Sequence, residues 1–123
     1  MPSPPAPDRL LLHGLCFLGH HGVSSQEREM GGEYRVDLDV ETVITAAAAS
    51  DRLEDTTDYV RLCRVVQEVV EERSFALLEA LAEAIAEAVL AVPGVDRVRL
   101  RVTKPARLPV QSQGFAVEVC RPR

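Results

Sequence analysis

The chain has 123 residues, 46% hydrophobic and 27% charged, so it is long enough to form one globular domain with its own core. Its formal net charge of −5 argues against nucleic acid or an anionic membrane as the main partner, because both require a basic surface. No apolar run approaches the roughly 20 residues that span a bilayer. The three cysteines are far apart and form no CxxC pair, which favours a reducing compartment, and we expect a cytoplasmic protein.

The first third of the chain predicts a short lead and two strands. Residues 1–7 are rich in proline and lack the basic and apolar regions of a signal peptide, so we expect a disordered lead. Residues 9–17 are apolar at odd and even positions, which predicts a strand covered on both faces, with Gly14 as a bulge. The polar segment 24–32 predicts a loop or a short turn of helix. Residues 33–42 alternate between apolar and polar side chains, which predicts an antiparallel strand with one face in solvent.

Two helices are predicted in the middle of the chain. Residues 58–72 place apolar side chains at helical spacing, and Thr57 or Asp58 is the expected N-cap. The pattern recurs over residues 74–90, where Ser74 is the expected N-cap. Because only a short connection separates the two segments, we expect adjacent antiparallel helices.

Two further strands are predicted over residues 95–104 and 114–121, which alternate again. The order β-β-α-α-β-β indicates a single α+β domain over residues 8–123, with a four-stranded antiparallel sheet, two helices on one face and charged residues on the other. The acidic side chains of the second strand and the basic side chains of the third complement each other if the strands are neighbours. The sheet has open edges, and we expect these to pair between subunits.

Three glutamates on the second helix, Glu79, Glu83 and Glu87, have no cationic partner on that helix, since no Lys or Arg lies between Arg73 and Arg97. For Glu83 and Glu87 we expect an ordinary solvated face. Glu79 lies at the border of the apolar stripe, about one turn from the positive end of the helix dipole. A ligand-binding role for Glu79 therefore competes with the solvated alternative.

Three other side chains are candidates for chemistry. Lys104 is in phase with the apolar residues of its strand, so it points either to the helix-covered face or past the sheet edge. Tyr59, taken alone, is expected in the core with its hydroxyl at the boundary. Glu27, taken alone, is an ordinary surface charge. The three histidines do not have the spacing of zinc ligands, and we expect neither a metal nor a cofactor.

Taken together, the strings GHHGVSSQERE, EDTTDY, LLEALAE and VTKP, in this order and spacing, resemble dihydroneopterin aldolase. The resemblance runs from about Asp8 to Arg121. It implies the ββααββ tunnelling fold, in which four subunits close a β-barrel and two barrels stack into an octamer. It also implies cleavage of 7,8-dihydroneopterin into 6-hydroxymethyl-7,8-dihydropterin and glycolaldehyde, a step of folate biosynthesis that uses neither a metal nor a Schiff base.

The resemblance also implies roles for five residues. Glu79 corresponds to the glutamate that anchors the pterin ring, and Leu78 would supply a backbone contact. Lys104 corresponds to the catalytic lysine, and Glu27 to a loop glutamate. Tyr59 corresponds to a tyrosine that a neighbouring subunit donates. The implied partners are therefore a pterin substrate and further copies of the chain, with sites at the subunit interfaces.

Two alternative functions share these features. An epimerase acting on dihydroneopterin or its triphosphate uses the same fold and the same carbon–carbon cleavage. A non-catalytic pterin-binding or assembly module would keep the pocket but give Lys104 no role. The products formed from 7,8-dihydroneopterin distinguish the three: glycolaldehyde, an epimer, or neither.

Overall fold

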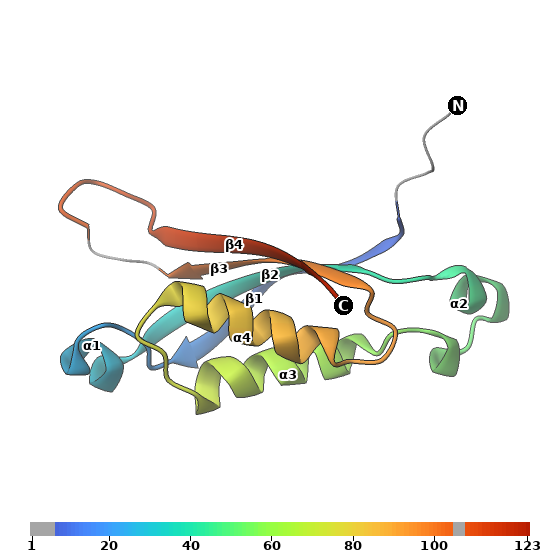
Figure 1. The fold of residues 1–123 in the computed structure, drawn as a ribbon, viewed down its shortest axis with the longest axis horizontal. Helices are drawn as coiled ribbons and strands as arrows, with labels where there is room; N and C mark the ends of the chain where they lie inside the picture. Colours follow the sequence, from blue (N-terminus) through green and yellow to red (C-terminus); the bar gives the residue numbers. More distant parts are fainter. Residues whose placement is uncertain (1–6, 105–107) are drawn as a thin grey trace.

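The computed structural model describes residues 7–104 and 108–123, which form one sheet with two long helices against it (Figure 1). Apart from Pro7, the lead predicted for residues 1–7 lies outside the described residues. The elements in chain order are β1 Arg9–Gly19, α1 Ser25–Met30, β2 Gly32–Glu41, α2 Thr45–Ser50, the 3₁₀ helix η1 Leu53–Asp55, α3 Tyr59–Glu72, α4 Leu78–Leu90, β3 Arg97–Lys104 and β4 Phe115–Pro122. None of the helices in the described ranges is long and apolar enough to cross a membrane.

The sheet is antiparallel, and its strand order β1-β2-β3-β4 follows the sequence. Helices α3 and α4 lie side by side across one face, which confirms the predicted α+β class and the paired helices (Figure 1). The core lies between the helices and the two central strands. Its largest fully buried side chains are Tyr34, Val36, Leu38 and Val40 of β2, Leu100 of β3, Leu62, Val66 and Val70 of α3, Leu81, Ile85 and Val89 of α4, and Val95.

Strand β1 contains the predicted bulge, but it is not covered on both faces. Leu12 pairs with Leu38 and Leu15 pairs with Val36, so β1 has one extra residue at this point, where Gly14 has a φ of 76°. The extra residue reverses the alternation, because successive side chains of a strand point to opposite faces. Even-numbered leucines therefore pack on the core before the bulge and odd-numbered residues after it. That switch explains why core-facing residues of both parities occur in the segment, while Leu11 and Cys16 are exposed.

The two long helices begin in different ways. Asp58 caps α3, as predicted, and its carboxylate accepts hydrogen bonds from the backbone N–H groups of Val60 and Arg61. The prediction that Ser74 caps the second helix is wrong. Helix α4 begins four residues later, with Leu77 at the N-cap and no side-chain cap, while the Ser74 hydroxyl donates to the His20 carbonyl at 2.6 Å.

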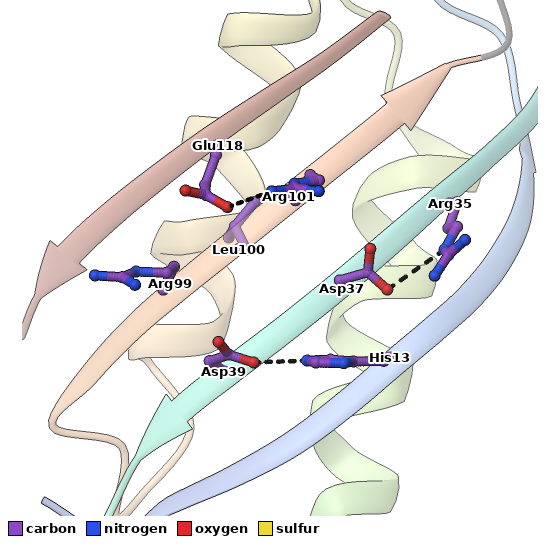
Figure 2. A pocket seen from close by; sticks show the side chains of 8 residues that line it. All are labelled: His13, Arg35, Asp37, Asp39, Arg99, Leu100, Arg101 and Glu118. Carbon is purple, nitrogen blue, oxygen red and sulfur yellow. Dashed lines mark hydrogen bonds and ion pairs between the residues drawn. The ribbon is translucent and has the colours of Figure 1, made fainter. Parts of the chain in front are cut away.

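The open face of the sheet carries the predicted complementary charges. The register of β2 and β3 places Asp37 opposite Arg101, Asp39 opposite Arg99 and Glu41 opposite Arg97. Within this set only Glu41 and Arg97 form a direct ion pair, at 3.4 Å. The other partners come from neighbouring positions: Arg35 with Asp37, Glu118 with Arg101 and His13 with Asp39 (Figure 2). Each of the three carboxylates thus has a basic partner, whereas Arg99 forms no ion pair with the residues that the structure describes.

Candidate active site

A pocket of about 290 Å³ is lined by the last residue of β3, the start of α4 and the turn after β1. Figure 1 shows that these parts of the backbone lie at the α1 end of the sheet. Two connecting segments form much of the pocket wall: the turn 19–22 and the connection 73–77 between α3 and α4. The backbone N–H of Gly22 donates to the Phe75 carbonyl at 2.9 Å, which joins them. The lining residues are His21, Gly22, Val23, Glu27, Tyr34, Ala76, Leu77, Leu78, Glu79, Lys104 and Phe115.

Glu27 is held by a capping box at the start of α1. Its backbone N–H donates to the Ser24 hydroxyl at 3.1 Å, and its Oε1 accepts from the Ser24 backbone N–H at 3.3 Å and from the Ser24 hydroxyl at 3.1 Å. The bonds from Ser24, followed by that from Lys104, hold the pKa of Glu27 below its usual range. Glu27 is therefore a fixed carboxylate at neutral pH. It is part of a short helix, and the Ser24-x-x-Glu27 spacing is a recognisable sign of that helix start.

Lys104 points to the helix-covered side, as the parity of β3 predicts. Its Nζ lies 3.3 Å from Glu27 Oε2 and 6.0 Å from the centre of the Tyr34 ring. Its side chain is 27% exposed, so the amine reaches the pocket while its stem is covered. Lys104 is also the only lysine in the sequence. Arginine cannot give up its proton near neutral pH. Among the lysine and arginine side chains of the sequence, only that of Lys104 can therefore transfer a proton.

Glu79 lies in the first turn of α4, and Leu78, the first residue of the helix, lines the pocket with it. Among the described residues no side chain pairs with the Glu79 carboxylate, so it is available to a ligand in the pocket. Glu83, one turn later, is not the free solvated group we expected. Its carboxylate accepts from Arg121 of β4, with an Nη2–Oε2 distance of 3.1 Å.

Tyr59 is not part of this pocket within one chain. It is the first residue of α3, and α3 begins at the end of the sheet away from α1 (Figure 1). The residue is 60% exposed, so the expectation that Tyr59 is a core residue is wrong. The sequence therefore brings four of the five predicted site residues together and leaves Tyr59 at the opposite end of the molecule.

His21 and Tyr34 line the pocket but were not among the predicted site residues. The sequence offers His21 only as a possible metal ligand, whereas the residue is 3% exposed and hydrogen-bonded inside the protein. The Tyr34 hydroxyl donates to the His21 carbonyl at 3.3 Å. Tyr34 is in phase with the buried residues of its strand, and a buried tyrosine hydroxyl needs a hydrogen-bond partner. This feature of the sequence could have indicated that Tyr34 contacts another polar group. Within residues 7–104 and 108–123 no three His, Cys, Asp or Glu side chains are grouped to hold a metal ion.

The chemistry of the pocket follows from three charged groups. A free carboxylate at a helix start can accept two N–H groups of a flat polar ring, and an amine fixed by a second carboxylate can exchange a proton with that ring. The fold and the pocket together thus define a small α+β domain with a candidate site for acid–base chemistry on a small polar ligand.

Comparisons with known proteins agree with this class. The sequence profile of dihydroneopterin aldolase matches residues 10–120. A dihydroneopterin aldolase of Methylorubrum extorquens is 36% identical over 118 residues, which cover 94% of this chain and 91% of the relative. This chain belongs to the dihydroneopterin aldolase family, and it is a lyase.

Solved structures show the same fold. A putative dihydroneopterin aldolase from Vibrio cholerae matches with a TM-score of 0.91 at 30% identity, covering 97% of this chain and all of that one. A dihydroneopterin aldolase from Escherichia coli, solved in complex with neopterin, matches with a TM-score of 0.86 at 27% identity, over 93% of this chain and 98% of that one.

Proposed function

We propose that this chain cleaves 7,8-dihydroneopterin into 6-hydroxymethyl-7,8-dihydropterin and glycolaldehyde, as a step of folate biosynthesis in the cytoplasm. The observation that carries the proposal is that one pocket contains both the free Glu79 carboxylate and the Lys104 amine, which Glu27 holds in place. Family membership supports the reaction, and the neopterin bound to the Escherichia coli relative supports a pterin as the ligand class.

Glu79 is the proposed anchor for the pterin ring. Its two oxygens would accept the ring amide N–H and the neighbouring exocyclic amine, which is a bidentate, charge-assisted arrangement. The backbone of Leu78 would contact the same edge of the ring. Because α4 begins without a side-chain cap, the positive end of the helix is left for the carboxylate and its ligand.

Lys104 is the proposed proton donor. Loss of the 2′-hydroxyl proton breaks the C1′–C2′ bond and releases glycolaldehyde, while the bonding electrons move into the ring imine. Lys104 would protonate the ring nitrogen as the enamine forms. In the second half of the reaction C1′ gains a proton while the ring nitrogen returns its proton to Lys104, which restores the ring imine of the product. The pterin imine accepts the electrons, so the reaction needs neither a metal nor a lysine Schiff base. Glu27 and Tyr59 would hold the side-chain hydroxyls and the water that relays protons.

Product analysis tests this function directly. We expect the purified chain to release glycolaldehyde from 7,8-dihydroneopterin, and to do so equally well after dialysis against EDTA. Chromatography of the pterin products, with a separate assay for glycolaldehyde, distinguishes cleavage from epimerisation. An epimer without glycolaldehyde would assign the chain to the epimerases. Loss of activity in EDTA that zinc restores would contradict the metal-free mechanism.

The site requires a second subunit if Tyr59 takes part, because Tyr59 lies at the far end of the same chain. We therefore propose a homo-oligomer, a tetramer or octamer, in which sheet edges pair and a neighbouring Tyr59 completes each pocket. The exposed edge strand β1 supports this assembly, since Leu11 and Leu18 are 56% and 62% exposed in the single chain.

Mixing two inactive variants tests the shared site. Tyr59→Phe and Lys104→Ala should each have low activity alone. After unfolding and refolding together they should recover about a quarter of the wild-type activity, because some sites then combine an intact lysine with an intact tyrosine. Sedimentation of each sample checks that assembly is unchanged. Recovery no greater than the sum of the separate variants would contradict the shared site.

A further inference from the structure

A buried imidazole joins the two segments that form the wall of the pocket. The backbone N–H of Phe75 lies 3.0 Å from His21 Nδ1, and His21 Nε2 lies 2.9 Å from the Val70 carbonyl. A peptide N–H can only donate, so Nδ1 must be the acceptor and the proton must be on Nε2, which donates to Val70. The neutral Nε2–H tautomer of His21 is therefore fixed by its two partners.

We call this arrangement of His21, Val70 and Phe75 the His21 clasp. Its imidazole stacks on the Phe75 ring, with ring centres 5.8 Å apart, and meets the edge of Tyr34 at 4.9 Å. Phe75 lies two residues before Leu77, the N-cap of α4, and that N-cap has no side-chain cap of its own. The clasp thus fixes the extended segment from which α4 starts, and the position of Glu79 depends on that start.

We propose that His21 is a positioning residue for pterin recognition: as the neutral Nε2–H tautomer it holds the connection 73–77, and hence Glu79, in place, and protonation releases that segment. The inference rests on the proposed function, because it takes Glu79 as the pterin anchor. His21 itself does not need to touch the reacting atoms.

The clasp is incompatible with a protonated imidazole. A proton on Nδ1 would face the Phe75 N–H, so two donors would meet in a buried site. Burial lowers the pKa of His21 below its ordinary value of about 6.5, and nearby His20 and Lys104 lower it further, while the Val70 carbonyl opposes the shift. The other ionisable groups around the clasp are Tyr34 of β2, Glu27 of α1 and Arg73, whose guanidinium lies 4.9 Å from the Phe75 ring centre.

The sign of the pH effect follows from this lowered pKa. The unfolded chain, or the released segment, binds a proton more readily than the clasp does. The stabilisation is therefore complete above about pH 6.5, the ordinary pKa of histidine, and decreases as the pH falls from there toward the lowered pKa of the folded state. We expect the connection 73–77 to loosen over the same range.

Two isosteric substitutions separate the halves of the clasp. His21→Asn places its side-chain amide oxygen at the Nδ1 position and so keeps an acceptor for the Phe75 N–H. His21→Gln reaches the Nε2 position and keeps the donor to Val70. Neither side chain titrates. We expect the glutamine variant to bind neopterin about 5- to 100-fold more weakly than wild type at pH 7.5, as expected for a buried N–H left unpaired, and the asparagine variant to be weakened less than the glutamine variant.

Calorimetry with neopterin between pH 5 and 8 is the first readout, and hydrogen–deuterium exchange of residues 73–79, corrected for intrinsic rates, is the second. Wild type should lose affinity and protection together as the pH falls, whereas His21→Asn should show neither change. His13→Asn is the matched control, because it removes an exposed histidine of the open sheet face. It should retain the pH profile of wild type.

A pH profile in His21→Asn identical to that of wild type would overturn the proposal, as would equal weakening by the two His21 variants. The exchange measurement on wild type needs no variant and no ligand. If wild type binds no neopterin, the proposed function fails. The exchange data then still decide whether His21 holds the connection.

Discussion

Replacing Lys104 with alanine is expected to lower the turnover of dihydroneopterin by roughly 10²–10⁴-fold, the usual effect of losing a general acid or base. The affinity for neopterin should change far less, because Glu79 would still hold the ring. Lys104 Nζ is fixed by Glu27 at 3.3 Å, and no other lysine in the sequence can replace it. Single-turnover cleavage, measured beside neopterin affinity by calorimetry, separates loss of the chemical step from loss of binding.

Lys104→Arg is the matched variant for this test. It keeps a cation that can pair with Glu27, but its guanidinium does not release a proton near neutral pH. We expect turnover to fall about as far as in the alanine variant while affinity is retained. Turnover close to wild type would mean that a fixed charge is sufficient, and it would remove the proton-transfer role. Because the sequence has one lysine, borohydride trapping that adds no mass to Lys104 would also support the absence of a Schiff base.

Glu79→Gln is expected to weaken neopterin binding by at least about 10- to 100-fold without unfolding the protein, since a hydrogen bond to a charged group contributes roughly 1.5–3 kcal/mol. The substitution preserves size but removes the charge, and it places an amide donor against the N–H groups of the ring. Calorimetry gives the affinity, and circular dichroism checks that the fold is retained.

Glu87→Gln provides the control for the same helix, because Glu87 is exposed two turns after Glu79 and does not line the pocket. It should bind neopterin as wild type does. Glu83 is a poorer control, since its ion pair with Arg121 links α4 to β4. If Glu79→Gln bound neopterin tightly, Glu79 would be a solvated surface group like Glu87.

The strands, and one pocket residue, could be predicted from alternation alone. The period of two in β2 and β3 predicted both strands, the complementary acidic and basic faces, and the helix-covered side as one of two directions for Lys104; the structure adds the register, with Asp37 opposite Arg101. These predictions succeeded because a half-buried strand has only two faces, so one apolar run fixes where every other side chain points.

The parts that could not be predicted depend on distant partners. Ser74 has the composition of an N-cap, but its hydroxyl bonds to His20, 54 positions earlier in the sequence. The tautomer of His21 is likewise set by Val70 and Phe75, which no local pattern near His21 reveals. The prediction for Tyr59 is wrong in the opposite sense. Its position on the apolar stripe of the helix suggests burial, but the part of the single chain that the structure describes leaves it exposed.

The extra residue in β1 restricts how the chain length can vary. Leu15 and the residues after it owe their orientation to the additional position at Gly14, and the turn 19–22 continues directly from them. Deleting one residue there would turn Leu15 and Phe17 away from the core. The strand end that leads into His21 would then present the opposite face. A relative that is one residue shorter at this place must therefore restore the phase before the turn. In alignments, a compensating insertion between positions 15 and 19 is the sign to look for.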